Sequence, residues 1–230
     1  MTTKIFKIYL TELYLQDQFK KGNIKGSIHL SFGQEHIDAK EATGFVLGNH
    51  RSHGQYIART DDIEGLIEQV CSGNSQHLYK PGEFLAHGIQ GALSGVAVGL
   101  ASEGVDVTYF IGDGTVGQGI LWEALGMCEG LPVVFVVIDN DYSMSLTKKT
   151  WLHNEIKHHP NVKYYNTLRV CGHSVNDTQM YRPRGERDMT GHYDYLIKDN
   201  QELFEKTKIE VYGRINDVAK RNKFSITKVS

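Results

Sequence analysis

The sequence predicts an α/β protein with a mostly parallel central sheet, and two observations support this prediction. A strand pattern, VDVTYFI, is followed by a helical pattern over residues 117–129 and then by a longer apolar run, PVVFVVI. Such a run is typical of a strand buried on both faces, and a helix that connects two such strands makes them parallel. The 40% hydrophobic content of the 230 residues is sufficient for the core of such a fold.

Three helices are predicted on the N-terminal side of this strand–helix–strand unit. The opening segment carries apolar residues at helical spacing and predicts an amphipathic helix that ends near Gly22. A second helix is expected to begin at Asp61 or Asp62, either of which can cap it, and to end at Gly73. Residues 88–101 are rich in glycine and alanine, and they predict a helix that allows close approach to another helix or to a ligand.

Two further elements are predicted on the C-terminal side. The stretch YYNTLRVCGHS predicts another strand, and residues 201–222 predict a terminal helix. The regions near residues 146–163 and 175–192 show the least periodicity and are expected to be irregular. Because the chain has four prolines and no repeat or linker-like tract, one domain over residues 1–230, with helical extensions at both ends, is the simplest organisation.

Composition and charge argue against several classes of function. The formal net charge of -2 provides neither a basic field for nucleic acid nor a polybasic patch for a membrane surface. The three cysteines lack the close Cys/His spacing of a zinc site and are interpreted as buried thiols in a reducing compartment. The opening stretch differs from a signal peptide, and no later run is long enough to span a bilayer. We therefore expect a cytoplasmic protein with a small ligand and with no nucleic-acid or membrane partner.

Polar side chains follow directly after both strands of the unit. Asp113 follows the first strand in the sequence GDG, and Asn140 follows the second. Ligands of doubly wound sheets bind beyond the carboxyl ends of parallel strands, so these two side chains are expected to lie side by side. Their oxygens would form a partial shell for Mg²⁺, which takes its other ligands from phosphate and water. GDG is also a common turn in which the aspartate caps a helix, so both interpretations stay open at this point.

Several segments, in the same order, resemble the alpha subunits of the first components of 2-oxo acid dehydrogenases. The thiamine-diphosphate motif of that family is matched by GDG, a helix, LPVVFVV and DNDYSMS. The family segment YRxHG is matched by HRSHG, and the loop HGHSxSD followed by YR is matched by CGHSVNDTQMYRPR. GSIHLSFGQEHIDA is similar to the family's HLxxGQEA region, and HGIQGALSGVAVGLA is similar to its GNGIVGAQxPxAxGxA helix.

The resemblance implies a three-layer thiamine-diphosphate-binding fold in which this chain is the diphosphate-binding domain. Asp113 and Asn140 would bind Mg²⁺ through their side chains, and Tyr142 would bind it through its carbonyl oxygen. Arg51 and His173 would contact the diphosphate, because arginine is a permanent planar cation and histidine can donate a hydrogen bond. The other implied cofactor contacts are Gly112, Gly114, Ile89 and Gln90. Without the resemblance, Arg51 would suit a surface ion pair and His173 a loop position.

Three histidines are candidates for catalysis by the same resemblance. His173 lies in the family-like loop CGHSVND. His29 and His53 lie in family-like segments where a histidine could face the substrate carboxylate or take part in a proton transfer. A structural imidazole with satisfied hydrogen bonds is the alternative for His29 and His53.

The chain also departs from the family pattern at three places. Asp139 and Asn140 replace a pair of asparagines, which retains the expected ligand and adds a charge beside it. His50 replaces the aromatic residue that precedes the family arginine. Over residues 144–172 the family has an additional strand and helix where this chain has a short polar segment, so the sequence predicts a compact variant.

The resemblance implies an enzyme subunit that uses thiamine diphosphate and Mg²⁺ to decarboxylate a 2-oxo acid and to transfer the resulting acyl or aldehyde unit. In that family a separate beta subunit carries the carboxylate that activates the cofactor. We therefore expect a separately encoded beta subunit in an α2β2 assembly, with a lipoyl acyltransferase as the acyl acceptor. One alternative is a two-subunit carboligase, acyloin- or transketolase-like, that adds a two-carbon or acyl unit to an aldehyde, ketone or sugar. The other is a noncatalytic paralogue that binds a subunit or cofactor without turnover.

Overall fold

The computed structural model describes residues 1–140, 150–167, 193–221 and 227–229 of the chain. Its helices are α1 (Thr2–Lys20), α2 (Glu35–Glu41), α3 (His53–Thr60), α4 (Ile63–Cys71), α5 (Ser94–Ser102), the 3-10 helix η1 (Asp113–Gly117), α6 (Gly119–Met127), α7 (Thr150–Ile156), α8 (Asp194–Asp199) and α9 (Gln201–Lys220). Its strands are β1 (Phe45–Gly48), β2 (Tyr79–Lys80), β3 (Phe84–Ala86), β4 (Val107–Gly112), β5 (Val133–Asp139) and β6 (Val162–Asn166).

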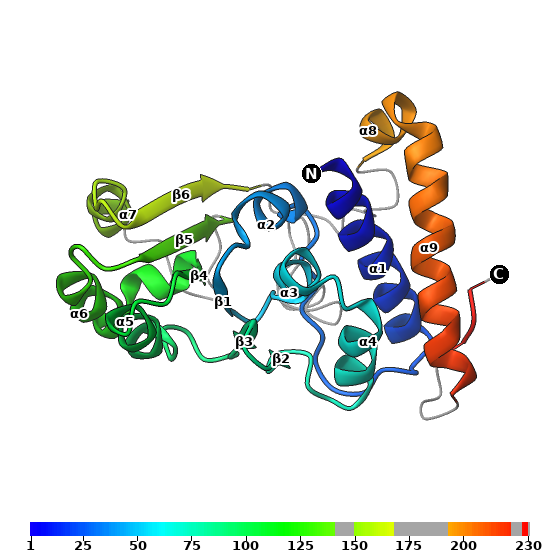
Figure 1. The fold of residues 1–230 in the computed structure, drawn as a ribbon, viewed down its shortest axis with the longest axis horizontal. Helices are drawn as coiled ribbons and strands as arrows, with labels where there is room; N and C mark the ends of the chain where they lie inside the picture. Colours follow the sequence, from blue (N-terminus) through cyan, green and yellow to red (C-terminus); the bar gives the residue numbers. More distant parts are fainter. Residues whose placement is uncertain (141–149, 168–192, 222–226, 230) are drawn as a thin grey trace.

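Within these ranges the strands form one sheet in the order β2-β3-β1-β4-β5-β6. The short edge strand β2 is antiparallel to β3, and every other neighbouring pair is parallel. The chain leaves β1 towards β3 on one side and later returns to place β4 on the other side of β1 (Figure 1). The carboxyl ends of β1 and β4 therefore form a topological switch point, which is where ligands bind in open α/β sheets. The predicted α/β class with a mostly parallel sheet is confirmed.

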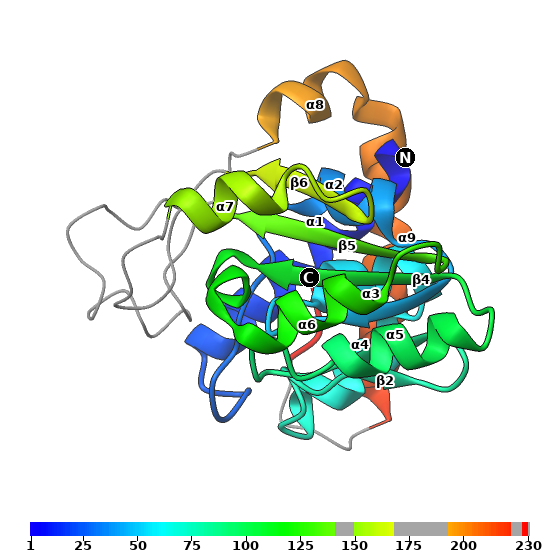
Figure 2. The ribbon, with the colours of Figure 1, turned by 90° about the vertical axis from the view of Figure 1, so that its left-hand side faces the viewer.

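Helices cover both faces of the sheet and enclose two cores. Figure 2 looks onto the face covered by α5, α6 and α7, where Tyr109 and Phe135 lie in the core. The opposite face carries α1, α3, α4 and α9, and its core includes Phe110 and Val136 from the same two strands. Successive residues of β4 and β5 are thus buried on opposite sides, which explains why both strands are mostly apolar.

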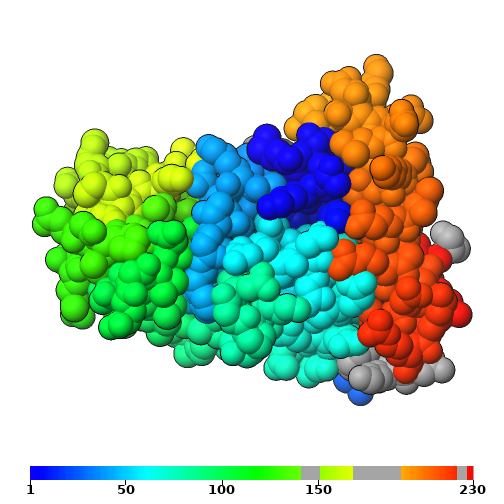
Figure 3. Space-filling model, in the orientation of Figure 1, coloured from blue at the N-terminus to red at the C-terminus, as the bar shows by residue number. Residues whose placement is uncertain are grey.

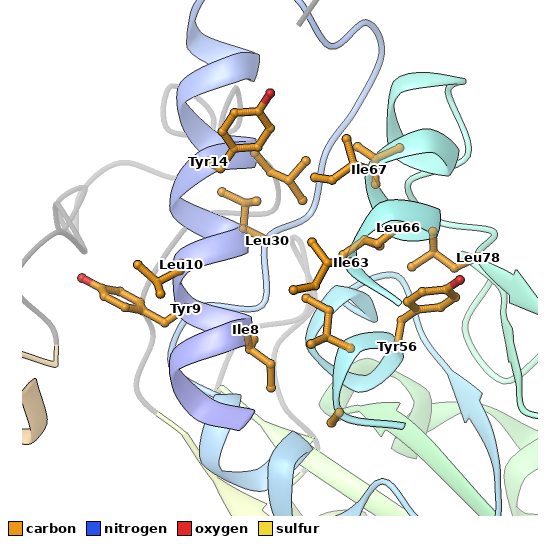
Figure 4. Close-up of a cluster of buried hydrophobic side chains, with 14 of the residues drawn as sticks. Ile8, Tyr9, Leu10, Tyr14, Leu30, Tyr56, Ile63, Leu66, Ile67 and Leu78 are labelled. Carbon is orange, nitrogen blue, oxygen red and sulfur yellow. The ribbon is translucent and has the colours of Figure 1, made fainter. Parts of the chain in front are cut away.

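The larger core lies between the first helix and the helices that follow β1. Figure 4 shows Ile8 of α1 and Leu30 facing Ile63 and Leu66 of α4, all of them fully buried or nearly so. Helix α9 packs along α1, as Figure 3 shows at the surface, and the rings of Phe6 and Phe204 meet edge to face at 5.1 Å. The helical segments predicted at both ends of the chain thus pack against each other.

The boundary between α3 and α4 resolves which aspartate caps the second predicted helix. Asp62 is the cap, because its Oδ1 accepts a hydrogen bond of 2.9 Å from the backbone N–H of Gly65. Asp61 ends the preceding helix in the left-handed conformation, with φ at 53°. Gly73, with φ at +90°, follows the end of α4 as predicted.

The predicted helix over residues 88–101 is too long at its N-terminal end. Helix α5 begins at Ser94, and residues 88–93 form turns that include Gly91 with φ at +76°. A residue in the left-handed conformation interrupts an α-helix, so the small residues at 88–93 form turns and only those from Ser94 onward form a helix.

The predicted irregular region near residues 146–163 is also wrong in part. This polar segment contains α7 and the start of β6, a helix and a strand where irregular structure was expected. The segment has weak apolar periodicity for two reasons. Strand β6 lies at the edge of the sheet and has no fully buried residue. Helix α7 buries few side chains, among them His153 and Ile156. The predicted strand YYNTLRVCGHS begins at Val162 instead, and residues 168–192 lie outside the described ranges.

Two further sequence-based expectations concern thiols and membranes. Cys128 is buried as predicted, Cys71 is half-buried, and Cys171 lies outside the described residues. None of the described helices is both long and apolar enough to cross a membrane.

Candidate functional site

A pocket opens at the switch point, beyond the carboxyl ends of β1, β4 and β5. Segments that follow each of these strands converge on it, together with the loops before α2 and α5. It is lined by Gln34, Asn49, His50, Arg51, Gln90, Gly112, Asp113, Gly114, Thr115, Ile138 and Asn140. The pocket therefore gathers residues that are up to about a hundred positions apart in the chain and that belong to separate predicted motifs.

Asp113 and Asn140 lie in the same pocket because their strands are paired in register. Gly112, the last residue of β4, is opposite Ile138 of β5, so the residues that follow each strand emerge side by side. Asp113 opens η1, is 8% exposed, and accepts a hydrogen bond of 2.8 Å from the N–H of Gly114. This bond goes to the next residue and is not a helix cap, because η1 has no side-chain cap. The position of the carboxylate in the pocket suits a metal ligand.

Arg51 brings a guanidinium to the same pocket from the end of β1. Its side chain is 9% exposed, and Nη1 donates a hydrogen bond of 2.8 Å to the carbonyl oxygen of Leu30. The backbone around it is also held, because its N–H donates to Asn49 Oδ1 at 2.7 Å and its carbonyl accepts from Gln34 Nε2 at 2.9 Å. A largely buried cation with a fixed backbone is preorganised to bind an anion in the pocket.

The structure separates the three candidate histidines. His53 is fully buried outside the pocket lining, with Nδ1 3.2 Å from Glu12 Oε1 and Nε2 3.0 Å from Ser75 Oγ. His29 is 8% exposed, and its ring packs edge-on against that of His50, which lines the pocket, with centroids 5.2 Å apart. His173 lies outside the described residues. The contacts of His53 favour the structural alternative for that residue.

Of the other predicted cofactor contacts, some line the pocket and some do not. Gln90, Gly112 and Gly114 line the pocket, whereas the side chain of Ile89 is absent from its lining and is 67% exposed. Tyr142 lies outside the described residues, so its carbonyl ligand role stays a prediction, as does the role of His173.

Two pocket residues that the sequence analysis did not single out are Gln34 and Asn49. Gln34 donates to both Asp38 and the carbonyl of Arg51, and so joins α2 to the loop that carries the arginine. Asn49 directly follows β1 and accepts a hydrogen bond from the N–H of Arg51. Both were visible in principle, since Gln34 stands in the GQE segment and Asn49 at a predicted strand end.

Buried carboxylates lie immediately behind the pocket wall. Burial raises the pKa of Glu35 to about 7, while hydrogen bonds from Tyr193 Oη at 2.5 Å and from the Gly33 N–H at 2.8 Å oppose this rise. Burial also raises the pKa of Asp38 well above its usual range. Glu35 thus links the wall residue Gln34 to Tyr193, which precedes α8.

We expect the Glu35→Gln variant to lose part of the pH dependence of folding stability. The folded state keeps the proton on Glu35 up to about pH 7, whereas the unfolded state releases it near its usual pKa of 4.5. The unfolded state therefore binds fewer protons between these pH values, so wild-type stability falls as pH rises through them, by about 3 kcal/mol for this group. Asp38 acts in the same direction, so the variant retains a smaller slope.

Urea unfolding at pH 5 and pH 8 measures this difference in stability for the wild type and the variant. The matched control is Glu103→Gln, which removes an exposed carboxylate and is expected to leave the wild-type pH difference unchanged. Equal pH differences in the wild type and Glu35→Gln would show that Glu35 does not titrate in this range.

Comparison with known proteins gives two family matches that overlap in the middle of the chain. Residues 6–154, which include the whole pocket lining, match the dehydrogenase E1 component family. Residues 86–225 also match the 1-deoxy-D-xylulose-5-phosphate synthase family.

The relatives are alpha subunits of one enzyme component. Subunit alpha of the pyruvate dehydrogenase E1 component from Rickettsia felis is 27% identical over 265 residues, which cover 86% of this chain and 81% of the relative. The mitochondrial protein of the same name from Saccharomyces cerevisiae is 30% identical over 148 residues, or 55% of this chain and 35% of the relative. The Rickettsia alignment is longer than this chain, so that relative has residues without a counterpart here, as expected for a compact variant. The chain belongs to the dehydrogenase E1 component family.

Proposed function

We propose that this chain is the alpha subunit of a two-subunit thiamine-diphosphate-dependent enzyme that decarboxylates a 2-oxo acid and transfers the resulting acyl or aldehyde unit. The observation that carries the proposal is the gathering of Asp113, Asn140 and Arg51 in one pocket at the switch point of the sheet. These side chains come from two separate segments that resemble the family motifs, and the chain belongs to the E1 family.

The residues of the pocket fit the proposed cofactor and metal. A carboxylate and an amide oxygen suit Mg²⁺, and the Arg51 guanidinium suits a diphosphate oxygen. The backbone at Gly112 leaves room for a close approach, because the nearest atom that an added Cβ would meet is His50 Cε1 at 3.9 Å. Donor chemistry, charge and access therefore agree.

In this proposal the chain binds and orients the cofactor, and the bound cofactor supplies the stabilised carbanion that permits decarboxylation. Asp113 and Asn140 would hold Mg²⁺ through their side chains, together with the carbonyl oxygen of Tyr142. Arg51 and His173 neutralise and position the diphosphate of the cofactor. The low exposure of Asp113 and Arg51 keeps these charges largely out of water, which strengthens their hold on the ligand.

A separate beta subunit is proposed to complete the active site, in an α2β2 assembly. Support comes from α5 and α6, where the apolar side chains of Val96, Ile120 and Met127 are 40%, 45% and 70% exposed. On α5, a Cβ added at Gly95 or Gly99 would meet no atom within 4 Å, so another backbone could approach closely. Exposed apolar side chains on helices that another backbone can approach closely are typical of a protein–protein contact.

We expect the purified chain to show no decarboxylation by itself and to gain it with its beta subunit. The cofactor cleft of the family lies between two domains, and only one of them is proposed for this chain, so catalysis depends on assembly. The measurement is carbon dioxide release from a panel of 2-oxo acids, with thiamine diphosphate and Mg²⁺ present, for the chain with and without its co-expressed partner. Full turnover by the isolated chain would contradict the two-subunit proposal.

A carboligase is the second candidate function, and one observation favours it. Residues 86–225 match a family named for a synthase and not for a dehydrogenase. Adding aldehyde, ketone and sugar acceptors to the same assay separates the two candidates: a carboligase forms a new carbon–carbon bond, whereas a dehydrogenase-type subunit transfers the acyl unit to a lipoyl acyltransferase. Cofactor binding without any turnover in the complete assembly would instead indicate a noncatalytic paralogue.

A further inference from the structure

Asp139, where the family has an asparagine, makes a specific contact on the side of β5 away from β4. Its side chain is 2% exposed and accepts a hydrogen bond from the hydroxyl of Tyr164 on the neighbouring strand β6. Asp139 is the last residue of β5 and directly precedes the proposed ligand Asn140. The extra charge in this position is thus tied to a tyrosine of the edge strand.

The same tyrosine joins the carboxylate to helix α7. His153 Nδ1 lies 2.6 Å from Tyr164 Oη and 3.8 Å from Asp139 Oδ2, and its side chain is nearly fully buried. Since the tyrosine hydroxyl donates its proton to Asp139, the imidazole Nδ1–H donates to the hydroxyl oxygen. The ammonium of Lys157, one helical turn after His153, lies 4.5 Å from the centre of the Tyr164 ring.

These contacts connect Asp139, which precedes Asn140, to Tyr164 of β6 and to His153 of α7. Helix α7 in turn packs against η1, the short helix that begins with Asp113. The backbones of both proposed Mg²⁺ ligands are therefore connected to this set of contacts, Asn140 through Asp139 and Asp113 through η1.

We propose that Asp139, Tyr164 and His153 form a positioning network that fixes the separation of Asn140 and Asp113 for metal binding. This inference rests on the proposed function of the pocket. Octahedral Mg²⁺ tolerates little variation in ligand geometry, so a fixed backbone on both sides of the ion improves affinity. The network gives the Asp139 substitution a role, because a carboxylate is a stronger acceptor for the tyrosine hydroxyl than an amide.

The adjacent tyrosines of β6 provide a matched test. Tyr164→Phe removes the hydroxyl that binds Asp139, whereas Tyr165→Phe removes a hydroxyl that donates to Glu41 at 2.5 Å and accepts from Lys40 at 3.1 Å. Each variant loses one bond between a hydroxyl and a carboxylate on the same strand. Their effects on the strand itself are therefore similar, and only Tyr164→Phe affects the network.

The measurement is binding of Mn²⁺, as a paramagnetic probe for Mg²⁺, to the full chain with its beta subunit and saturating thiamine diphosphate. The loss of the free Mn²⁺ signal gives the dissociation constant. We expect Tyr164→Phe to raise this constant about 10-fold or more, and Tyr165→Phe to stay within about 2-fold of the wild type. Asp139→Ala should reproduce the loss, and Asp139→Asn, which keeps an acceptor oxygen, should retain most of the affinity.

The outcomes distinguish this inference from the proposed function. If the wild type binds Mn²⁺ with thiamine diphosphate and Tyr164→Phe binds it equally well, or if both tyrosine variants lose affinity equally, the positioning network is wrong and the proposed function stands. If the wild type does not bind Mn²⁺ with thiamine diphosphate, both are overturned. Should Tyr164→Phe fail to fold, the pair Asp139→Ala and Asp139→Asn decides the matter by the same criterion.

Discussion

Asp113→Ala is expected to weaken Mg²⁺-dependent binding of thiamine diphosphate by at least ~100-fold, the largest effect of a single substitution at the proposed site. Asp113 is the only carboxylate in the proposed ligand set, and Mg²⁺ depends on such a ligand when its other partners are neutral oxygens and phosphate. Loss of groups that merely orient a metal ligand already costs about 10–100-fold, so loss of a direct ligand should exceed that range.

The fold should survive this substitution. Asp113 lies at a strand end and not in either core, and its bond to the N–H of Gly114 is worth about 1 kcal/mol. Calorimetry with cofactor and Mg²⁺ measures the affinity of the variant assembly, and circular dichroism checks its fold.

The matched control is Asp106→Ala, at the other end of β4. Asp106 is exposed and precedes the strand, so this variant makes the same change of charge far from the pocket. Wild-type affinity in Asp113→Ala, or an equal loss in Asp106→Ala, would remove Asp113 from the ligand shell.

Gly54→Ala is expected to destabilise the protein by about 3 kcal/mol or more, although it adds a single methyl group. Gly54 lies in α3 where that helix crosses α1 and α2, within the HRSHG segment. An added Cβ would lie 2.3 Å from Asp38 Oδ2, 2.9 Å from Ser31 Oγ and 3.1 Å from Ile8 Cγ2. Relief requires movement of a buried carboxylate that Gln34 holds in place, so the pocket wall would be disturbed as well.

Gly213→Ala in α9 provides the opposite case. An added Cβ there would meet no atom within 4 Å, and alanine favours a helix over glycine, so stability should rise by about 0.5–1 kcal/mol. Urea unfolding of the two variants and the wild type measures both differences. Destabilisation of similar size in both would show that the loss at Gly54 does not come from the close contact with Asp38.

The centre of the fold could be predicted from the sequence because its information is local. Strands β4 and β5 are mostly apolar, the helix between them is short, and polar residues follow each strand. Once both strands are parallel neighbours, the meeting of Asp113 and Asn140 follows from geometry. The resemblance added Arg51, whose strand has four residues and little periodicity of its own.

The parts that escaped prediction depend on contacts between distant residues. His53 is held by Glu12 and Ser75, 41 and 22 positions away, and no local pattern shows that its two ring nitrogens are already engaged. Helix α7 and strand β6 read as polar because an edge position leaves most of their side chains at the surface. The hydrogen bond between Tyr164 and Asp139 likewise joins residues 25 positions apart, and no local sequence pattern predicts it before the pairing of β5 and β6 is known.

The packing of α1 against α9 has a consequence for how the chain is made. The surface of α1 that α9 covers cannot be buried until about 180 further residues have been synthesised, which takes roughly 10–40 s at ~5–20 residues per second. During this interval the apolar side chains of α1 that will contact α9, Phe6 among them, remain exposed on the nascent chain. The growing polypeptide should therefore be a substrate for chaperones that bind near the ribosome, and it should need them less once Phe204 has emerged.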